Sequence, residues 1–414
     1  MTAGPTLFMD LRPLRESPAF RRLWLGSALS STGGVMTTFA VSLQVFMLTG
    51  SSLAVGAVGL ATALPGIVFG LLGGAIADAV DRRKLVLVTN SAMAVVSALL
   101  AVQAFAGLNQ LWPLYTLVAV QSVLNTVNSP ARSTFVPRLL SPERLPAGIV
   151  LSMFTFHLSV TVGPTLAGLV TAAWGLKLCY LLDAVSFAAA LYGVFRLPPM
   201  PPEGGATRAS LRSVGDGLRF IRRSKVLTGA FLSDMNAMVL GIPIAVFPAI
   251  NAERFGGSAQ TLGLLTAAVA AGGVLGTVLS GPVRRVSRHG LGMLVAGSVW
   301  GLALAGFGLA HDLWLALTLL GLAGAADVLS VVFRSTMVQV STPDGYRGRI
   351  SAAEYVVGGV CPQLGNFRAG AVGSLTSSGF SVVSGGLATV LGSALIGLAL
   401  PAFTRYRASR EPAH

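Results

Sequence analysis

Two carboxylates inside long apolar stretches are the residues of this chain best suited to chemistry. Asp234 lies about 12 Å into the run that begins at Val226, at a rise of ~1.5 Å per helical residue. Asp327 lies inside the run from Leu313 to Phe333. Ionisable groups inside a bilayer are costly unless they are paired or hydrated, so each is a functional candidate by default. Because a partly desolvated carboxylate can exchange protons near neutrality, we predict that at least one of these two residues is a proton-coupling site.

The composition indicates an integral membrane protein. The 414 residues are 53% hydrophobic and only 11% charged, with a mean hydropathy of +0.74, whereas about a quarter of a soluble domain is charged. Runs of ~20 apolar residues are long enough to cross a bilayer as helices. We predict an all-α membrane protein with twelve such spans, at about Leu23–Leu48, Leu53–Ala77, Leu85–Gly107, Leu111–Ser129, Ala147–Trp174, Leu178–Leu197, Val226–Ile250, Leu262–Val283, Leu291–Ala310, Leu313–Phe333, Ile350–Thr376 and Phe380–Phe403.

The positive charge of the chain follows its predicted topology. The formal net charge is +14, with 29 Lys and Arg residues. Only Lys177 and Arg254 fall in loops on one side of the predicted spans, and Arg368 lies inside a span. Basic residues collect on the cytoplasmic side of membrane proteins. We therefore predict that both termini are cytoplasmic and that the charge reflects orientation in a lipid bilayer, with no nucleic-acid partner.

An internal repeat predicts two related halves. Arg132-Ser133-Thr134 returns as Arg334-Ser335-Thr336, and the glycines that bound 163–168 return at 365–370, both 202 positions later. Parallel six-helix repeats are typical of one class of secondary transporter. We place the first six-helix bundle at residues 1–197 and the second at 226–414. Residues 198–225 form a Pro- and Gly-rich linker and an amphipathic basic helix on the cytoplasmic side.

The loop after the second apolar run carries a transporter-like motif. Gly74, Asp78, Arg82 and Arg83 resemble the loop between helices 2 and 3 of the major facilitator superfamily, although Ala79 and Asp81 depart from its pattern. Further segments resemble a subfamily of bacterial exporters typified by the enterobactin (siderophore) exporter. These segments are Pro18–Arg21, Leu43-Gln44, Met47–Ser51, Ser129–Arg132 and Gly348–Ile350.

The resemblance implies a fold of two pseudo-symmetric six-helix bundles that alternate access by rocking. It implies a monomer in the bacterial inner membrane, without a cofactor. It also implies a cytoplasmic gate in which Asp78 meets the start of span 11 near Arg347 and Arg349, assisted by Gly74, Arg82 and Arg83. Gly163-Pro164 and Gly168 partly match an antiporter signature, so these residues, with Gly365 and Gly370, are expected to pack where the halves meet.

Polar residues on the predicted spans suggest a substrate cavity. Gln121, Asn125, Asn128 and Arg132 are spaced by 4, 3 and 4 residues and share one helical face. Asn125 also lies seven residues before Arg132, as Asp327 lies seven before Arg334. Hydrogen bonding between helices of the first half is the alternative for this face. The full set of cavity candidates is Gln44, Gln121, Asn125, Asn128, Asn236 and Arg368.

Other polar groups have structural alternatives. Asp327 could instead form an ion pair with Arg334, and Asp234 could hydrogen bond to Asn236 or a neighbouring helix. Arg368 could snorkel towards the outer surface. We expect Asp183 to anchor span 6, and His157 to be a packed residue in span 5. Cys179 and Cys361 show no metal-ligand or disulfide spacing.

These features predict a secondary active exporter of a small amphipathic molecule, siderophore-like or antibiotic-like, coupled to protons as an antiporter. Broad multidrug efflux, import of a solute, and a receptor or scaffold without transport stay open as alternatives. The chain contains no Gly-x-x-x-x-Gly-Lys-Ser/Thr loop, so direct use of ATP is not expected. No enzyme activity is expected.

Overall fold

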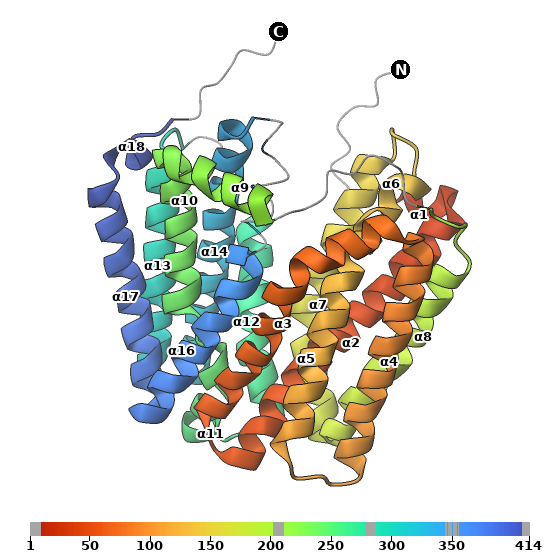
Figure 1. The fold of residues 1–414 in the computed structure, drawn as a ribbon. Coiled ribbons are helices and arrows are strands. Elements are labelled where there is room, and N and C mark those ends of the chain that lie inside the picture. Colours follow the sequence, from red (N-terminus) through yellow and green to blue (C-terminus); the bar gives the residue numbers. More distant parts are fainter. Residues whose placement is uncertain are drawn as a thin grey trace. The chain divides into compact units, whose positions relative to one another are not determined.

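The computed structural model describes residues 10–201, 211–278, 286–343, 346, 350, 354 and 356–407. It does not describe the side chains of residues 70–75, 77, 78, 211–214, 217, 218 and 356. Within the described ranges the elements are helices and no strand forms (Figure 1). The prediction of an all-α protein is confirmed for this part of the chain.

The chain divides into two compact units. One contains Met1–Gln44 and Leu64–Ala209, and the other contains Val45–Ala63 and Ser210–His414. The sequence placed the boundary between the halves at residues 198–225. The stretch Val45–Ala63, which belongs to the first repeat, packs with the second unit.

The first unit is built from long helices joined by short turns. Glycines with positive φ begin or end several of them, including Gly175, which separates α7 from α8 at φ 86°. The helices are α1 (Arg12–Glu16), α2 (Pro18–Thr49), α3 (Ser52–Ala79), α4 (Arg82–Phe105), α5 (Leu111–Ser133), α6 (Phe135–Leu139), α7 (Leu145–Trp174) and α8 (Leu176–Phe195). The last residues of α2 and the first part of α3, within Val45–Ala63, belong to the second unit.

In the second unit, the first span is broken into four short elements. The α-helix α10 (Lys225–Asn236) passes into a π-helical turn, η1 (Ala237–Gly241), then a 3₁₀ turn, η2 (Ile244–Val246), and α11 (Phe247–Arg254). Pro243 lies in the break, where its missing N–H and fixed φ interrupt the helical hydrogen bonds. The other elements are α9 (Leu211–Arg223), α12 (Ala259–Val278), α13 (His289–Leu309), α14 (Leu313–Ser341), a second π turn η5 (Val356–Val360), α16 (Cys361–Leu375), α17 (Ser378–Ala399) and α18 (Pro401–Thr404).

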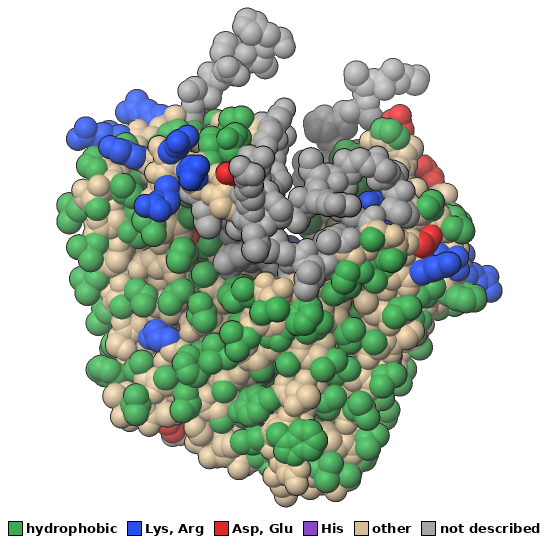
Figure 2. Space-filling model, viewed as in Figure 1, with side chains coloured by type: hydrophobic (Ala, Val, Ile, Leu, Met, Phe, Trp, Pro, Cys, Tyr) green, Lys and Arg blue, Asp and Glu red, His purple; other side chains and the backbone are tan. Residues whose placement is uncertain are grey.

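Ten of the described helical stretches are long and apolar enough to cross a bilayer. Two predicted spans are outside this set. Predicted span 4 is the helix α5, which carries Gln121, Asn125 and Asn128, and predicted span 11 is divided between η5 and α16. The count of twelve spans therefore stays a prediction. Figure 2 shows hydrophobic side chains over much of the face in view, with Lys and Arg side chains gathered over α9 and α18 and in a second group at the right-hand edge.

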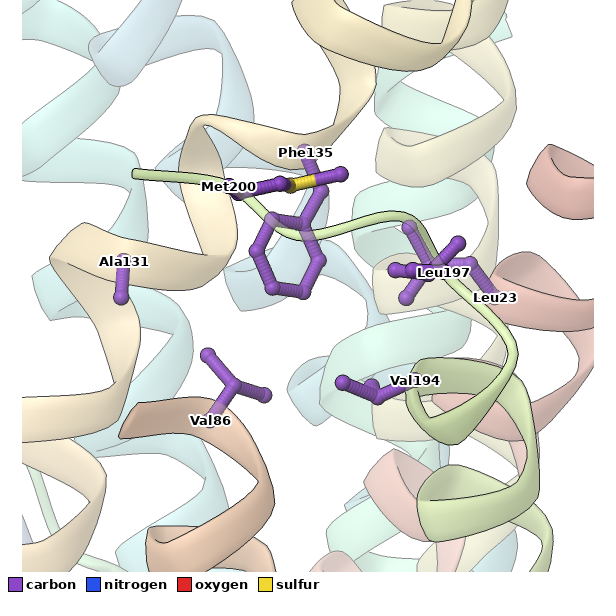
Figure 3. Packing of buried hydrophobic residues seen from close by; sticks show 7 residues of the cluster. All are labelled: Leu23, Val86, Ala131, Phe135, Val194, Leu197 and Met200. Carbon is purple, nitrogen blue, oxygen red and sulfur yellow. The ribbon is translucent and has the colours of Figure 1, made fainter. Parts of the chain in front are cut away.

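A cluster of buried side chains fixes one end of the first unit. Phe135 of α6 and Ala131 of α5 are fully buried together with Leu23, Val86, Val194, Leu197 and Met200. Figure 3 shows the ring of Phe135 beneath Met200, with Leu23 and Leu197 beside it. Because five helices and the 197–200 segment contribute to this cluster, it sets the rotation of the last turn of α5.

Asp183 connects three helices of the first unit. Its carboxylate is fully buried on α8 and accepts hydrogen bonds from Thr37 of α2 at 2.8 Å and from Ser97 of α4 at 2.7 Å. The other carboxylate oxygen lies against Gly33 of α2, where an added Cβ would be 2.6 Å from it. The expected anchoring role of Asp183 fits these contacts, which require a glycine at position 33.

Substitution of Gly33 tests this packing against a neighbouring control. Gly33→Ala is expected to lower the free energy of unfolding of the detergent-purified protein by about 1–3 kcal/mol, and with it the melting temperature. The reason is that the new methyl group overlaps Asp183 and Ser186. Gly34→Ala meets nothing within 4 Å and should be neutral or slightly stabilising. Equal melting temperatures for the two variants would show that the three-helix contact at Asp183 is loose.

Candidate functional site

A buried ion pair connects the first and fourth spans of the second unit. Asp234 of α10 accepts a hydrogen bond from the guanidinium of Arg334 on α14. The exposed fractions of the two side chains are only 6% and 12%. Removing one member of a buried pair costs about 3–5 kcal/mol, since the other charge is left uncompensated. Each residue therefore makes the other tolerable within an apolar helix bundle.

Two further carboxylates lie within electrostatic range of this pair. Asp327 lies two helical turns before Arg334 on α14 and interacts electrostatically with both Asp234 and Arg334. Glu354, at the start of the eleventh span, interacts electrostatically with Asp234. Asp327 and Glu354 are half-buried, so they are more accessible than Asp234. We call these four residues the acidic cluster; it contains three carboxyl groups and one guanidinium group.

Apolar packing sets the position of the acidic cluster. Phe333 and Met337 of α14 are buried against Ala230 of α10 and Phe403 of α18. Arg334 is therefore held on the face of α14 next to α10. Asn236 donates to the backbone carbonyl of Thr389 on α17 at 2.9 Å, which fixes the end of α10 before the π turn.

Two pairings that the sequence left open as alternatives are not the ones that the structure shows. Arg334 pairs directly with Asp234, whereas the sequence alternative paired it with Asp327. Asp327 is two turns away along the same helix, while α10 packs alongside α14. Asn236 donates a hydrogen bond to α17 and not to Asp234, and its amide group packs against Gly392. We therefore no longer count Asn236 among the cavity candidates.

The polar face of α5 divides into accessible and buried residues. Asn125 is exposed, and Gln121 is half-buried with an Oε1 that has no hydrogen-bond partner among the described residues. Asn128 is only 1% exposed and donates to Thr89 and Asn90 of α4, at 2.6 and 2.9 Å. The alternative of hydrogen bonding between helices therefore describes Asn128, while Gln121 and Asn125 stay candidates for the pathway.

Gln44 also belongs to a network between helices. Its side chain exchanges two hydrogen bonds with Gln103 of α4, at 3.0 and 3.3 Å, and accepts one from Tyr180 of α8 at 2.7 Å. Tyr180 is completely buried. These contacts use the amide group of Gln44, so we no longer count this residue among the cavity candidates.

Arg368 lies against other helices of the second unit. Its guanidinium approaches Gly385 of α17 so closely that an added Cβ there would lie 2.6 Å from Nη2. The carbonyl oxygen of Leu240 in η1 is 2.4 Å from the same hypothetical Cβ. Arg368 is thus enclosed between α16, α17 and the broken span, and its Nε and Nη2 are buried without a hydrogen-bond partner among the described residues. A meeting with substrate at this position stays a prediction.

The first part of α3 packs on α16 through glycines. An added Cβ at Gly56 would lie 2.9 Å from the carbonyl oxygen of Asn366, and one at Gly370 would lie 2.3 Å from that of Ser52. The backbone N–H of Leu53 donates to Ser374 Oγ at 2.8 Å, and Ser51 Oγ is 3.4 Å from Ser374 Oγ. We call this contact, which lies within the second unit, the α3–α16 seam. It includes Gly370, whereas Gly365 packs against Met238 of η1.

The other predicted packing glycine lies within the first unit. An added Cβ at Gly163 of α7 would meet Val35 of α2 at 2.7 Å. Pro164 and Gly168 of the same helix are buried. His157 is exposed on α7 and contacts the ring of Phe156 edge to face, with centroids 5.6 Å apart.

The predicted cytoplasmic gate is described only in part. The side chain of Asp78, the surroundings of Gly74, and Arg347 and Arg349 lie outside the described residues. Arg83 donates to the carbonyl oxygen of Phe195 at 2.5 Å, and the backbone N–H of Arg82 donates to that of Met200 at 3.0 Å. These two contacts attach the start of α4 to the end of α8 and the 197–200 segment.

Two members of the acidic cluster were not recognised as site residues from the sequence. Arg334 was noted for the repeat and as a structural partner of Asp327, and Glu354 was not considered. Glu354 lies within the predicted span Ile350–Thr376, so the rule that selects ionisable residues in apolar runs would have found it.

Comparison with known proteins shows that this chain is similar to transporters. The curated enterobactin exporters EntS of Shigella boydii and Escherichia coli O139:H28 are each 28% identical over 406 residues, covering 96% of this chain and 96% of theirs. Among solved structures, the nucleoside transporter NupG has a TM-score of 0.71 at 15% identity, covering 94% of this chain and 100% of its own. An inward-facing bacterial homologue of the iron transporter ferroportin has a TM-score of 0.68 at 18% identity, covering 94% and 99%.

The solved structures show the fold alone, and the fold is that of the major facilitator transporters. The family model described as transmembrane secretion effector matches residues 9–412. A match over nearly the whole chain assigns the family directly, and it is a family of transporters rather than enzymes. The protein is a multi-pass membrane exporter that belongs to the transmembrane secretion effector family.

Proposed function

We propose that this protein is a proton-coupled antiporter that exports a small amphipathic molecule of the siderophore type from the bacterial cytoplasm by alternating access. The observation that carries this proposal is the acidic cluster, in which Asp327 and Glu354 lie within electrostatic range of the buried ion pair of Asp234 and Arg334 inside the second unit. The resemblance to curated enterobactin exporters supports the siderophore class. The positive charge of the predicted cytoplasmic loops supports cytoplasmic termini.

The cluster can couple proton uptake to transport through exchange of partners. When Asp234 binds a proton, its attraction to Arg334 falls, and Arg334 can turn towards Asp327 on its own helix. Loss of the proton restores the pair between α10 and α14. Because η1 follows Asp234 within three residues, a change in this contact acts on a span that is already broken.

Broad multidrug efflux is the second candidate, and the same cluster supports it. Three carboxyl groups around one guanidinium group favour cations, and many drugs are amphipathic cations. Metabolite profiling separates the two. Under iron limitation, a deletion strain should retain a siderophore inside the cell if the first proposal holds. Unchanged siderophore release together with raised sensitivity to cationic drugs would favour multidrug efflux, and a loss of nutrient uptake would favour import.

Neutralising the two aspartates tests the coupling. Asp234→Asn or Asp327→Asn should abolish the pH dependence of transport in at least one case, because an amide cannot carry the proton. The measurement is uptake, by everted membrane vesicles, of the compound that the deletion strain retains, over a series of pH values. Asp234→Asn with Arg334→Gln is the folding control, since it removes both charges of the buried pair. If the double variant Asp234→Asn, Asp327→Asn still concentrates the compound with an unchanged pH response, neither residue couples transport to protons.

The α3–α16 seam provides a test of alternating access. If the outer side opens during the cycle, Ser51 and Ser374 should separate. With Ser51→Cys and Ser374→Cys, oxidation should form a disulfide across the present 3.4 Å contact and reduce export at least tenfold, reversibly with dithiothreitol. The native Cys179 and Cys361 are buried, so they should not compete. The single variants under the same oxidant are the controls. Full export by the cross-linked protein would mean that this seam does not open.

A further inference from the structure

The two arginines related by the repeat have different surroundings. Arg334 of α14 pairs with Asp234, whereas Arg132 of α5, 202 positions earlier, has no hydrogen-bond or ion-pair partner for its guanidinium among the described residues. Both lie beside buried residues that fix the helix, Phe333 and Met337 for Arg334, and Ala131 and Phe135 for Arg132. Arg132 lies in the last turn of α5, next to the turn at Thr134, whereas Arg334 lies seven residues before the end of α14. The two arginines therefore differ both in their place on the helix and in their neighbouring side chains.

Each acidic partner in the second unit has a neutral counterpart in the first. Asn125 corresponds to Asp327 at an offset of 202, and Ser152 corresponds to Glu354 at the same offset. The positions 202 and 203 residues before Asp234 are Thr32 and Ser31, which both carry hydroxyl groups. Thr32 and Ser152 also use their hydroxyl groups in local contacts, with Ser159 and with the carbonyl of Gly148. The first unit thus keeps the arginine and replaces every carboxylate around it.

The accessible face of α5 continues from this arginine. Asn125 lies seven residues before Arg132 and Gln121 eleven before it, so all three project on one side of the helix. Asn125 is exposed, Arg132 is half-buried, and Gln121 has a buried Oε1 without a hydrogen-bond partner among the described residues. Arg132 lies in the last turn of α5, and its guanidinium has no acidic partner among the described residues. This face therefore offers cationic donors to an anion, next to two amide groups.

We propose that Arg132 binds a carboxylate group of the exported molecule, with Asn125 and Gln121 hydrogen bonding to its neutral polar atoms. This proposal rests on the export function proposed above and assigns the substrate class of the pathway. The planar guanidinium offers paired donors that match a carboxylate in a bidentate contact. The acidic cluster then serves proton coupling, while the first unit recognises the anion.

Transport of two probes of opposite charge tests this assignment. Everted vesicles that contain the wild-type protein should accumulate the anionic amphiphile carboxyfluorescein. Arg132→Gln should raise the KM for carboxyfluorescein by about tenfold or more, as expected for loss of a charged hydrogen bond, and change the maximal rate little. Arg132→Lys should recover part of the loss. Phe156→Ala, on the exposed apolar surface of α7, is the matched control and should keep the wild-type KM.

The outcomes separate the two proposals. Wild-type transport of the cation ethidium but not of carboxyfluorescein would overturn the assignment of Arg132 and leave export standing. Transport of both probes with an unchanged KM for carboxyfluorescein in Arg132→Gln would also overturn it. Transport of no probe and no retained metabolite in the deletion strain would overturn the export function together with the assignment. A KM increase confined to carboxyfluorescein, with partial rescue by lysine, supports the inference.

Discussion

The contact between Asp234 and Arg334 is the constraint on which the chemistry of this transporter depends. A lone charge in an apolar helix bundle is strongly unfavourable, and the pair is tolerated because each member compensates the other. The contact joins α10 to α14 just before α10 gives way to a π turn. A protonation event at this contact therefore changes both the electrostatics of the second unit and the packing of its broken span.

The two copies of the sequence repeat differ in charge around their arginines. The second half places carboxylates around its arginine, and the first half replaces them with hydroxyl and amide groups. The buried carboxylate of the first unit, Asp183, accepts hydrogen bonds from the neutral hydroxyl groups of Thr37 and Ser97. Such an asymmetry allows one half to handle protons and the other to handle substrate, without competition for the same side chain.

The fold was largely predictable from the sequence, because long apolar runs must become helices in lipid and the repeat at 202 residues defines two related halves. The candidate site was predictable in part. Asp234 and Asp327 stood out as ionisable residues in apolar runs, a signal that needs no knowledge of neighbours. The pairing of Arg334 with Asp234 was not predicted, and only an ion pair with Asp327 was considered as an alternative, since the choice between the two carboxylates depends on how α10 rotates against α14.

The roles of amide side chains were the least predictable. Asn125 and Asn128 lie three residues apart on α5, yet one is exposed and the other is buried against Asn90 of α4. Gln44 in the same way forms bonds with Gln103 and Tyr180. A difference of ~60° around a helix decides between these roles, and only the packing of neighbouring helices fixes it. The π turns are also set by such packing and have no simple sequence signal.

Proton release on substrate binding is the most direct test of the account. Purified protein in weakly buffered detergent solution near neutral pH would be mixed with the compound that the deletion strain retains, and the change in pH recorded. An antiporter that works through the acidic cluster should release about one proton per bound molecule, and the variant with Asn at positions 234 and 327 should release none. Saturable binding without proton release by the wild-type protein, at any pH between about 6 and 8, would contradict coupling through Asp234 and Asp327.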